Sequence, residues 1–381
     1  MSEQEKTAKA ADSRSKGSSL LRSSGIVGIM TMLSRILGLV RDVVVANYFG
    51  ASGSADAFFV AFKIPNFLRR LFAEGAFSQA FVPVLSEYRT QRDHAAVKAL
   101  VDRVAGTLGL TLITVTALAV LGAPLLTALF APGFYMAGGE KFDLAADMLR
   151  ITFPYLLLIS LTAFAGAILN SYERFAVPAF TPVLLNLTLI SSAVFLSPLF
   201  EQPILALAWG VMIAGVVQLV FQLPFLARLK LMPCPVVDRS DEGVRRILKL
   251  MLPALFGVSV TQINLLLDTV LASFLQTGSV SWLYYSDRLA ELPLGVFGIA
   301  IATVILPSLS RKHAAKSADH FAHTLDWAMR MVLLIGLPAA VALFILAGPM
   351  IVTLFHYGAL TDRDVTMASM SLQAYACGVL A

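Results

Sequence analysis

The sequence predicts an all-α polytopic membrane protein built as a two-lobe transporter bundle, and three observations predict it. The 381 residues are 57% hydrophobic and only 14% charged, whereas a soluble chain carries about 25% charged residues. Apolar runs recur along the chain at lengths that suit about 30 Å of hydrocarbon. Two of these runs hold charged side chains that a bilayer disfavours. We therefore expect about nine complete spans and a tenth in which the chain stops.

The first two apolar runs carry most of these charges. GIVGIMTMLSRILGLVRDVVVANYF contains Arg35, Arg41 and Asp42. DAFFVAFKIPNFLRRLFAEGAFSQAFVPVL contains a second and larger set, namely Asp56, Lys63, Asn66, Arg69, Arg70 and Glu74. A charge at the bilayer centre costs roughly 2.5–3.5 kcal/mol on insertion scales. These side chains must therefore face each other, water or a ligand.

Helical geometry predicts that the charges form stripes. At about 100° per residue, Asp56, Lys63, Arg70 and Glu74 fall on one face of a helix with Asn66 beside them, whereas Arg69 points elsewhere. Arg35 and Asp42 share a face of the first run by the same geometry. We interpret the two stripes as walls of a hydrated cavity lined with cations. The alternative is a set of buried structural ion pairs with arginines snorkelling from helix ends, and the central position of Arg35 in its run argues against snorkelling.

Further apolar runs complete the predicted bundle. They lie near 97–130, 145–170, 178–199, 203–227, 246–275, 281–310, 322–347 and from 363 to the end. Prolines interrupt many of the spans, at Pro65, Pro154, Pro182, Pro253, Pro293, Pro307 and Pro338. Proline-broken helices are common in transporters, although static membrane proteins contain them too.

The distribution of basic residues predicts the orientation. The loops after the second, fourth, sixth and eighth spans hold many Lys and Arg residues, whereas only Lys141 lies in the loops on the other side. The positive-inside rule therefore places the amino terminus and these basic loops in the cytoplasm. The net charge of +5 is explained by topology, and nucleic acid is not expected as a partner.

The longest polar stretches predict the domain organisation. We expect a disordered cytoplasmic tail at 1–23, a six-helix lobe at 24–227, a cytoplasmic linker at 228–245 and the start of a truncated second lobe at 246–381. Two bundles joined in this way are typical of alternating access, in which one lobe rocks against the other around a midplane site.

A second charged cluster lies in the run SVSWLYYSDRLAELPLGVFG. Asp287, Arg288 and Glu291 lie at helical spacing there, and we expect them to form a gate or a second wall of the cavity. The alternative is an interfacial cluster at a helix start, with Trp282 in an aromatic belt. In the seventh span Asp268 stands alone among apolar residues, so we expect it to be protonated, paired or bound to a cation.

The sequence excludes several kinds of chemistry. It contains no phosphate-binding Gly-rich loop followed by Lys-Ser/Thr, no HExxH and no GxSxG. Its five histidines lie in loops or near span ends, and Cys234 and Cys377 lie far apart. We therefore expect no catalytic residues, no metal site, no cofactor and no enzyme activity. Energy would come from a cation gradient, such as Na⁺, or from the membrane potential.

Several stretches of the sequence resemble a known family. LSRILGLVRDVVVANYFGA, the whole second charged run, ITFPYLLLISL, SYERFAVPAFTPVLLN and SWLYYSDRLAELPLG closely resemble the MurJ (MviN) family of lipid II flippases. The resemblance covers nearly all of residues 24–381. It implies membership of an exporter superfamily that also contains MATE drug antiporters and polysaccharide flippases. It further implies that lipid II, the undecaprenyl-diphosphate-linked disaccharide pentapeptide, moves from the cytoplasmic to the periplasmic leaflet for cell wall synthesis.

The resemblance also implies residue roles. Substrate-binding cations fall on Arg35, Arg41, Arg69, Arg70 and Arg288, whereas Asp56, Glu74, Asp287 and Glu291 would gate or pair with them. Some family members look to bind sodium through an aspartate that matches Asp268. The bacterial cytoplasmic membrane is the implied location, and membrane lipids and cell-wall synthesis enzymes are the implied further partners.

One departure and three rival functions remain open at this stage. The family has about fourteen spans, and this chain stops at YACGVLA, so we expect a fragment of a longer protein. A MATE-like drug antiporter or a polysaccharide exporter has the same predicted fold. The second rival function is a membrane-embedded enzyme that uses Asp56 or Glu291 as acid or base. The third is a scaffold for cell-wall enzymes.

Overall fold

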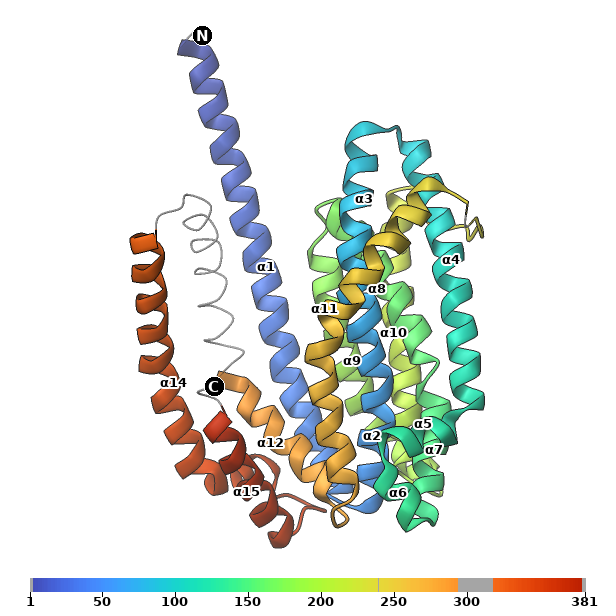
Figure 1. The fold of residues 1–381 in the computed structure, drawn as a ribbon, viewed down its shortest axis with the longest axis vertical. Helices are drawn as coiled ribbons and strands as arrows, with labels where there is room; N and C mark the ends of the chain where they lie inside the picture. The colour runs from blue at the N-terminus through green and yellow to red at the C-terminus, as the bar shows by residue number, and fades with distance from the viewer. Residues whose placement is uncertain (1–2, 239, 294–317, 379–381) are drawn as a thin grey trace. The chain divides into compact units, whose positions relative to one another are not determined.

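The computed structural model describes residues 3–238, 240–293 and 318–378, and it describes no side chains for residues 3–24, 72–74, 260, 261, 264, 265, 292, 293 and 318–323. All regular elements in the described part are helices, which confirms the predicted fold class. In chain order they are α1 (Glu3–Phe49), α2 (Gly53–Leu68), the π-helix η1 (Arg69–Phe77), α3 (Ser78–Gln91), α4 (His94–Leu121), α5 (Ala123–Phe130), α6 (Pro132–Ala137), α7 (Glu140–Thr152), α8 (Tyr155–Ser171), α9 (Ala176–Ser191), the short η2 (Ser192–Leu196) and η3 (Ser197–Leu199), α10 (Leu205–Arg228), α11 (Glu242–Ser273), α12 (Ser279–Pro293), α14 (Ala318–Phe355) and α15 (Asp362–Gly378) (Figure 1).

Five described helical segments are long and apolar enough to cross a membrane. They are His94–Leu121, Glu140–Ser171, Ala176–Leu199, Leu205–Arg228 and Thr324–Phe355. Each corresponds to a predicted span, and the protein is a multi-pass membrane protein. The first predicted span lies in α1 and is not among the five, and each of the other predicted spans includes residues whose side chains lie outside the described part. The total of nine spans and a tenth therefore stays a prediction.

The amino-terminal segment differs from its prediction. Helix α1 begins at Glu3, whereas the sequence predicted a disordered tail at 1–23. Residues 3–22 are rich in Ala, Glu, Lys and Arg, which have high helix propensity. Their polarity suggested disorder, but their backbone preference favours continuation of the helix.

The contacts divide the chain into two compact units, and the division differs from the predicted lobes. Unit 1 comprises residues 1–41 and 60–274, and unit 2 comprises residues 42–59 and 275–381. Helix α11 was predicted to open the second lobe, yet it packs along η1 and α3 in unit 1. The end of α1 and the start of α2 belong to unit 2.

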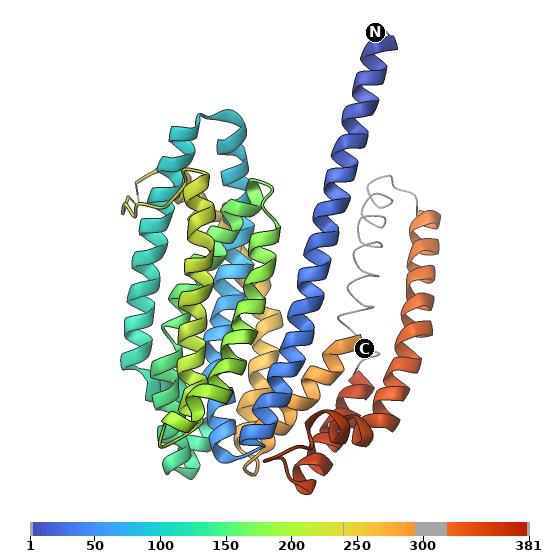
Figure 2. The same ribbon diagram turned by 180° about the vertical axis from the view of Figure 1, so that it is seen from behind.

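Unit 1 is a bundle in which α8 packs against α3, α4, α9 and α10 (Figures 1 and 2). A buried apolar core lies among η1, α3, α4 and α8 and includes three phenylalanines in mutual contact. The rings of Phe77 and Phe81 stack with centroids 5.1 Å apart, and Phe164 lies 5.1 Å from Phe81. Aromatic rings at such separations contribute about 0.5–1.5 kcal/mol beyond their buried area.

The predicted linker at 228–245 is fastened to α4. Asp102 accepts a hydrogen bond from the Cys234 amide at 2.7 Å, and Arg103 forms ion pairs with Asp238 and Asp241. Hydrogen bonds from the Ser240 side chain and amide lower the pKa of the Asp238 carboxyl below its usual value. Asp241 also caps α11 by accepting from Val244 N. The linker is therefore an ordered connection on the surface of unit 1.

A proline inside α2 is compensated by a side chain from α7. Pro65 has no amide hydrogen, so the carbonyl of Ala61 loses its helical donor. The hydroxyl of Thr152, which is fully buried, donates to that carbonyl at 3.1 Å. The helix then continues as the π-helix η1 from Arg69, which rotates later side chains away from ideal α-helical positions.

Unit 2 is built around the buried Tyr285 of α12. Its hydroxyl donates to the Gly50 carbonyl at 2.9 Å, and its ring lies 5.1 Å from that of Phe355 in α14. Ser286 Oγ donates to the carbonyl of Ala368 in α15 at 2.7 Å. Helix α12 is thereby tied to the turn after α1 and to both α14 and α15.

Thr152 provides a test of the proline compensation. We expect Thr152→Val to lower the stability of the detergent-solubilised protein by about 1–3 kcal/mol, because it leaves a buried carbonyl without a donor. Thr152→Ser keeps the hydroxyl and is the matched control. Thermal denaturation measures both variants, and equal melting temperatures for Thr152→Val and Thr152→Ser would contradict the assignment.

Candidate functional site

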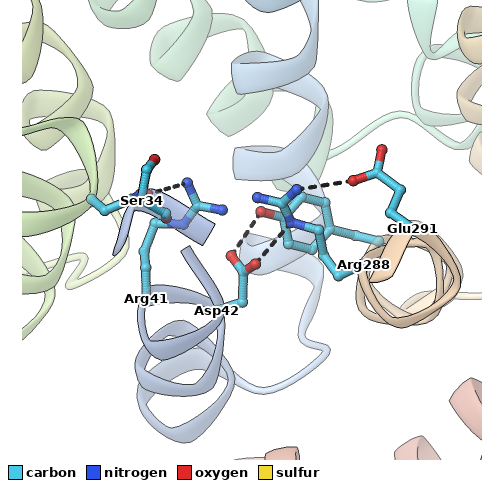
Figure 3. A network of polar contacts seen from close by, with 7 residues as sticks. Ser34, Arg41, Asp42, Arg288 and Glu291 are labelled. Carbon is cyan, nitrogen blue, oxygen red and sulfur yellow. Dashed lines mark hydrogen bonds and ion pairs between the residues drawn. The ribbon is translucent and has the colours of Figure 1, made fainter. Parts of the chain in front are cut away.

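The charged cluster of unit 2 centres on Arg288. Its Nε donates to Asp42 Oδ2 at 2.9 Å, and its Nη1 lies 3.2 Å from Glu291 Oε2 (Figure 3). Tyr284 donates its hydroxyl to Asp42 Oδ1 at 2.9 Å. Asp42 is 1% exposed, whereas the Glu291 side chain is 49% exposed. The arginine is therefore shared between a buried carboxylate and an accessible one.

Two aromatic contacts hold this cluster in place. The ring of Tyr284 stacks on Phe59 with centroids 4.0 Å apart, and the Arg288 guanidinium lies 5.9 Å from the Tyr284 ring centroid. Asp287 is half-buried on the same helix. Arg288 and Glu291, which were predicted to lie at helical spacing, form an ion pair. Asp42, which was not among the predicted binding or gating residues, is the second partner of Arg288.

Asp56 occupies the amino end of α12. Its carboxylate is fully buried and accepts hydrogen bonds from the amides of Gly278 and Ser281 and from the Ser281 hydroxyl, at 2.7–3.0 Å. A carboxylate at this position satisfies orphan amides and complements the helix dipole. Gly278 has φ +101°, and a Cβ there would clash with Trp282. Asp56 thus caps the amino end of α12 from another helix, and it is also a predicted gating residue.

A further buried carboxylate in unit 2 escaped sequence reasoning. Asp364 Oδ1 accepts from Trp282 Nε1 at 2.8 Å, and its Oδ2 accepts from the Thr361 amide and hydroxyl. Its position in the first turn of α15 was the available signal. Trp282 is 4% exposed, so it packs inside unit 2 instead of forming an interfacial belt.

In unit 1, Arg41 binds a side-chain amide that the sequence analysis did not identify. Arg41 Nη1 donates to Asn186 Oδ1 at 3.0 Å, and Asn186 Nδ2 donates to the Ser34 carbonyl at 2.9 Å. Arg41 is 6% exposed and Asn186 is 5% exposed. A polar amide within the apolar span of α9 was the signal for this contact. The guanidinium is therefore held inside unit 1, between α1 and α9.

The remaining predicted cations of unit 1 are more accessible than Arg41. Arg69 is half-buried, and its Nε donates to Asn66 Oδ1 at 3.2 Å, so the residue expected to point away from the stripe contacts one of its members. Arg35 and Arg70 are exposed, and neither forms an ion pair with any residue of the described part. Glu74 lies in η1, but its side chain is outside the described residues.

Asp268 in α11 is exposed in the structure. The helix packs against η1 and α3 elsewhere along its length. Among the described residues, His, Cys, Asp and Glu side chains form no group of three that could hold a metal ion. A cation site at Asp268 stays a prediction.

The two units thus offer different chemistry to a ligand. Arg35 and Arg70 present positive charge that no described carboxylate neutralises through an ion pair, and such guanidinium groups can bind phosphate oxygens in a bidentate way. Arg288 already has two acidic partners, so it would bind an anion only in competition with them.

Comparisons with known proteins identify the family of this chain. The family described as "Lipid II flippase MurJ" matches residues 45–381. A probable lipid II flippase MurJ of Vibrio cholerae is 57% identical over 95% of this chain and 70% of its own length.

Solved structures give the same result. A lipid II flippase MurJ in an inward closed conformation superposes with a TM-score of 0.78 at 32% identity, over 93% of this chain and 72% of that one. An inward-facing multidrug transporter of the MATE family has a TM-score of 0.72 at 17% identity, over 91% of this chain and 79% of that one, which shows the shared fold alone. Since the family match covers most of the sequence, the chain belongs to the MurJ family of lipid II flippases.

Proposed function

We propose that this protein is a flippase that moves lipid II from the cytoplasmic to the periplasmic leaflet by alternating access, for cell wall synthesis. The observation that carries the proposal is the 57% identity to a probable lipid II flippase over 95% of the chain. The Lys- and Arg-rich loops support a bacterial inner-membrane location with a cytoplasmic amino terminus. The function is transport, so no covalent chemistry is required of these residues.

The substrate's diphosphate explains the exposed arginines. Arg35 and Arg70 supply fixed positive charge at exposed positions. Each would bind phosphate oxygens through paired N–H groups, and neither must first break an ion pair with a described carboxylate. Arg41 and Arg69 would support binding from positions fixed by Asn186 and Asn66.

Arg288 would bind the headgroup in exchange for one of its acidic partners. Glu291 is the exchangeable partner, because it is exposed, whereas Asp42 is buried and also bound by Tyr284. Asp56, Glu74, Asp287 and Glu291 are the proposed gating residues. Asp56 would act by tying the start of α2 to the amino end of α12.

The energy source is proposed to be the membrane potential or a cation gradient. Asp268 is the proposed Na⁺ ligand, since it is an exposed carboxylate in the apolar stretch LLLDTVLA of α11. Cell-wall synthesis enzymes are proposed as further partners, because the product must be consumed at the outer leaflet.

The exposed arginines give the first functional prediction. We expect Arg35→Ala and Arg70→Ala each to lower lipid II translocation about tenfold or more. A charge-assisted hydrogen bond contributes about 1.5–3 kcal/mol, and about 1.4 kcal/mol corresponds to a tenfold change. The measurement uses cells depleted of their own flippase and follows cleavage of lipid II by a periplasm-restricted toxin.

Arg150→Ala is the matched control for these variants. Arg150 is also an exposed arginine of unit 1, but it pairs with Asp147 at 2.5 Å and is no predicted ligand. It should retain translocation. Normal cleavage in Arg35→Ala and Arg70→Ala cells with normal protein levels would refute the headgroup assignment.

The Arg288 cluster gives a second prediction. We expect Arg288→Gln to destabilise the protein by about 2 kcal/mol, because it leaves the buried Asp42 without its cation. Glu291→Gln should cost much less, since its carboxylate is exposed. Thermal denaturation of the double variant Asp42→Asn with Arg288→Gln should show less loss than the sum of the two single variants. Additive losses would show that the pair is not coupled.

A further inference from the structure

A cavity of about 300 Å³ lies in unit 1, and no residue assigned to lipid II is among those that line it. It is bounded by the turn between α8 and α9, the last turn of α10 and Ile26 of α1. The turn joins two candidate spans, Glu140–Ser171 and Ala176–Leu199, and Arg228 ends a third. The cavity therefore lies at the ends of three candidate spans, where we expect lipid headgroups.

Two arginines supply the positive charge of this cavity. Arg174 and Arg228 both line it and are both exposed. Neither forms an ion pair with any described residue, and the Arg228 guanidinium lies 5.6 Å from the Phe225 ring centroid. This contact orients Arg228 without neutralising it. Two guanidinium groups on one small cavity are suited to a phosphate.

The turn holds Arg174 in place at some conformational cost. The Arg174 amide donates to the Leu169 carbonyl at 2.9 Å and the Glu173 amide donates to the Asn170 carbonyl at 3.0 Å, which closes the end of α8. Glu173 has φ +62°, a backbone conformation that residues with a side chain rarely adopt. Its carboxylate lines the cavity and forms no ion pair in the described part, so it can accept a hydrogen bond from a ligand.

The rest of the wall is apolar. Ile26, Val177, Phe225 and Leu229 contribute to it. A free anion gains nothing from such a wall, whereas a lipid places its glycerol backbone and the first methylene groups of its chains there. Basic pockets between membrane helices on the cytoplasmic side commonly hold anionic headgroups.

From this geometry we propose that the cavity binds the headgroup of an anionic glycerophospholipid of the phosphatidylglycerol type. Its phosphodiester contacts Arg174 and Arg228, and a headgroup hydroxyl donates to Glu173. The bound lipid bridges the turn between α8 and α9 and the end of α10. The residues that line this cavity differ from the proposed transport residues, and its occupancy can be measured without translocation.

The test measures binding of fluorescently labelled dioctanoyl phosphatidylglycerol to the purified chain in detergent by fluorescence anisotropy. We expect the double variant Arg174→Gln with Arg228→Gln to weaken binding about tenfold or more, since both charged contacts are lost. Arg92→Gln is the matched control, because Arg92 is an exposed arginine that lies 4.1 Å from the Tyr88 ring and does not line the cavity. Equal affinity of the double variant and the wild type would overturn the proposal.

A second variant tests the cavity without removing charge. Ala176→Phe places a large side chain at an exposed position of the cavity wall and should also weaken binding about tenfold, with an unchanged melting temperature. Retained affinity in this variant would place the lipid elsewhere. Unlabelled dioctanoyl phosphatidylglycerol should displace the probe, whereas inorganic phosphate at the same concentration should not. Displacement by inorganic phosphate would overturn the lipid assignment in favour of a free-anion site.

Discussion

Charged side chains within otherwise apolar helices are the constraint on which the rest of this structure depends. Each such charge must be bonded, hydrated or matched by a ligand, because the hydrocarbon around a span provides none of these. The structure uses two solutions. Asp42 and Asp56 are buried and bonded within unit 2, whereas Arg35 and Arg70 are exposed on unit 1. The buried carboxylates stabilise the fold, and the exposed arginines leave positive charge available for a substrate.

The buried carboxylates hold irregular segments together. Asp56 joins the start of α2 to the amino end of α12, and Asp364 joins the start of α15 to Trp282. Both accept several hydrogen bonds, so each satisfies amides at a point where helical bonding ends. A residue of this kind has a structural role whether or not it also gates transport. Loss of activity after its substitution therefore needs a stability measurement beside it.

Sequence reasoning predicted the helices better than the contacts between them. Length, hydropathy and proline positions placed the apolar spans, because these properties are local. The stripe of Asp56, Lys63, Arg70 and Glu74 assumed one ideal helix, yet a π-helix begins at Arg69. The bonds of Arg41 to Asn186 and of Arg288 to Asp42 join residues 145 and 246 positions apart, which no local pattern reveals. The resemblance of several complete sequence motifs to those of the MurJ family identified the family, because such a comparison does not depend on knowing the contacts between helices.

The central claim is that the chain relocates lipid II without changing it, and reconstitution tests this claim most directly. Purified protein in liposomes would receive fluorescent lipid II in one leaflet, and a membrane-impermeant quencher would report its arrival in the other. The account predicts protein-dependent transfer of a lipid whose mass is unchanged. A lipid of altered mass, or no transfer by folded protein under an imposed membrane potential or sodium gradient, would contradict it.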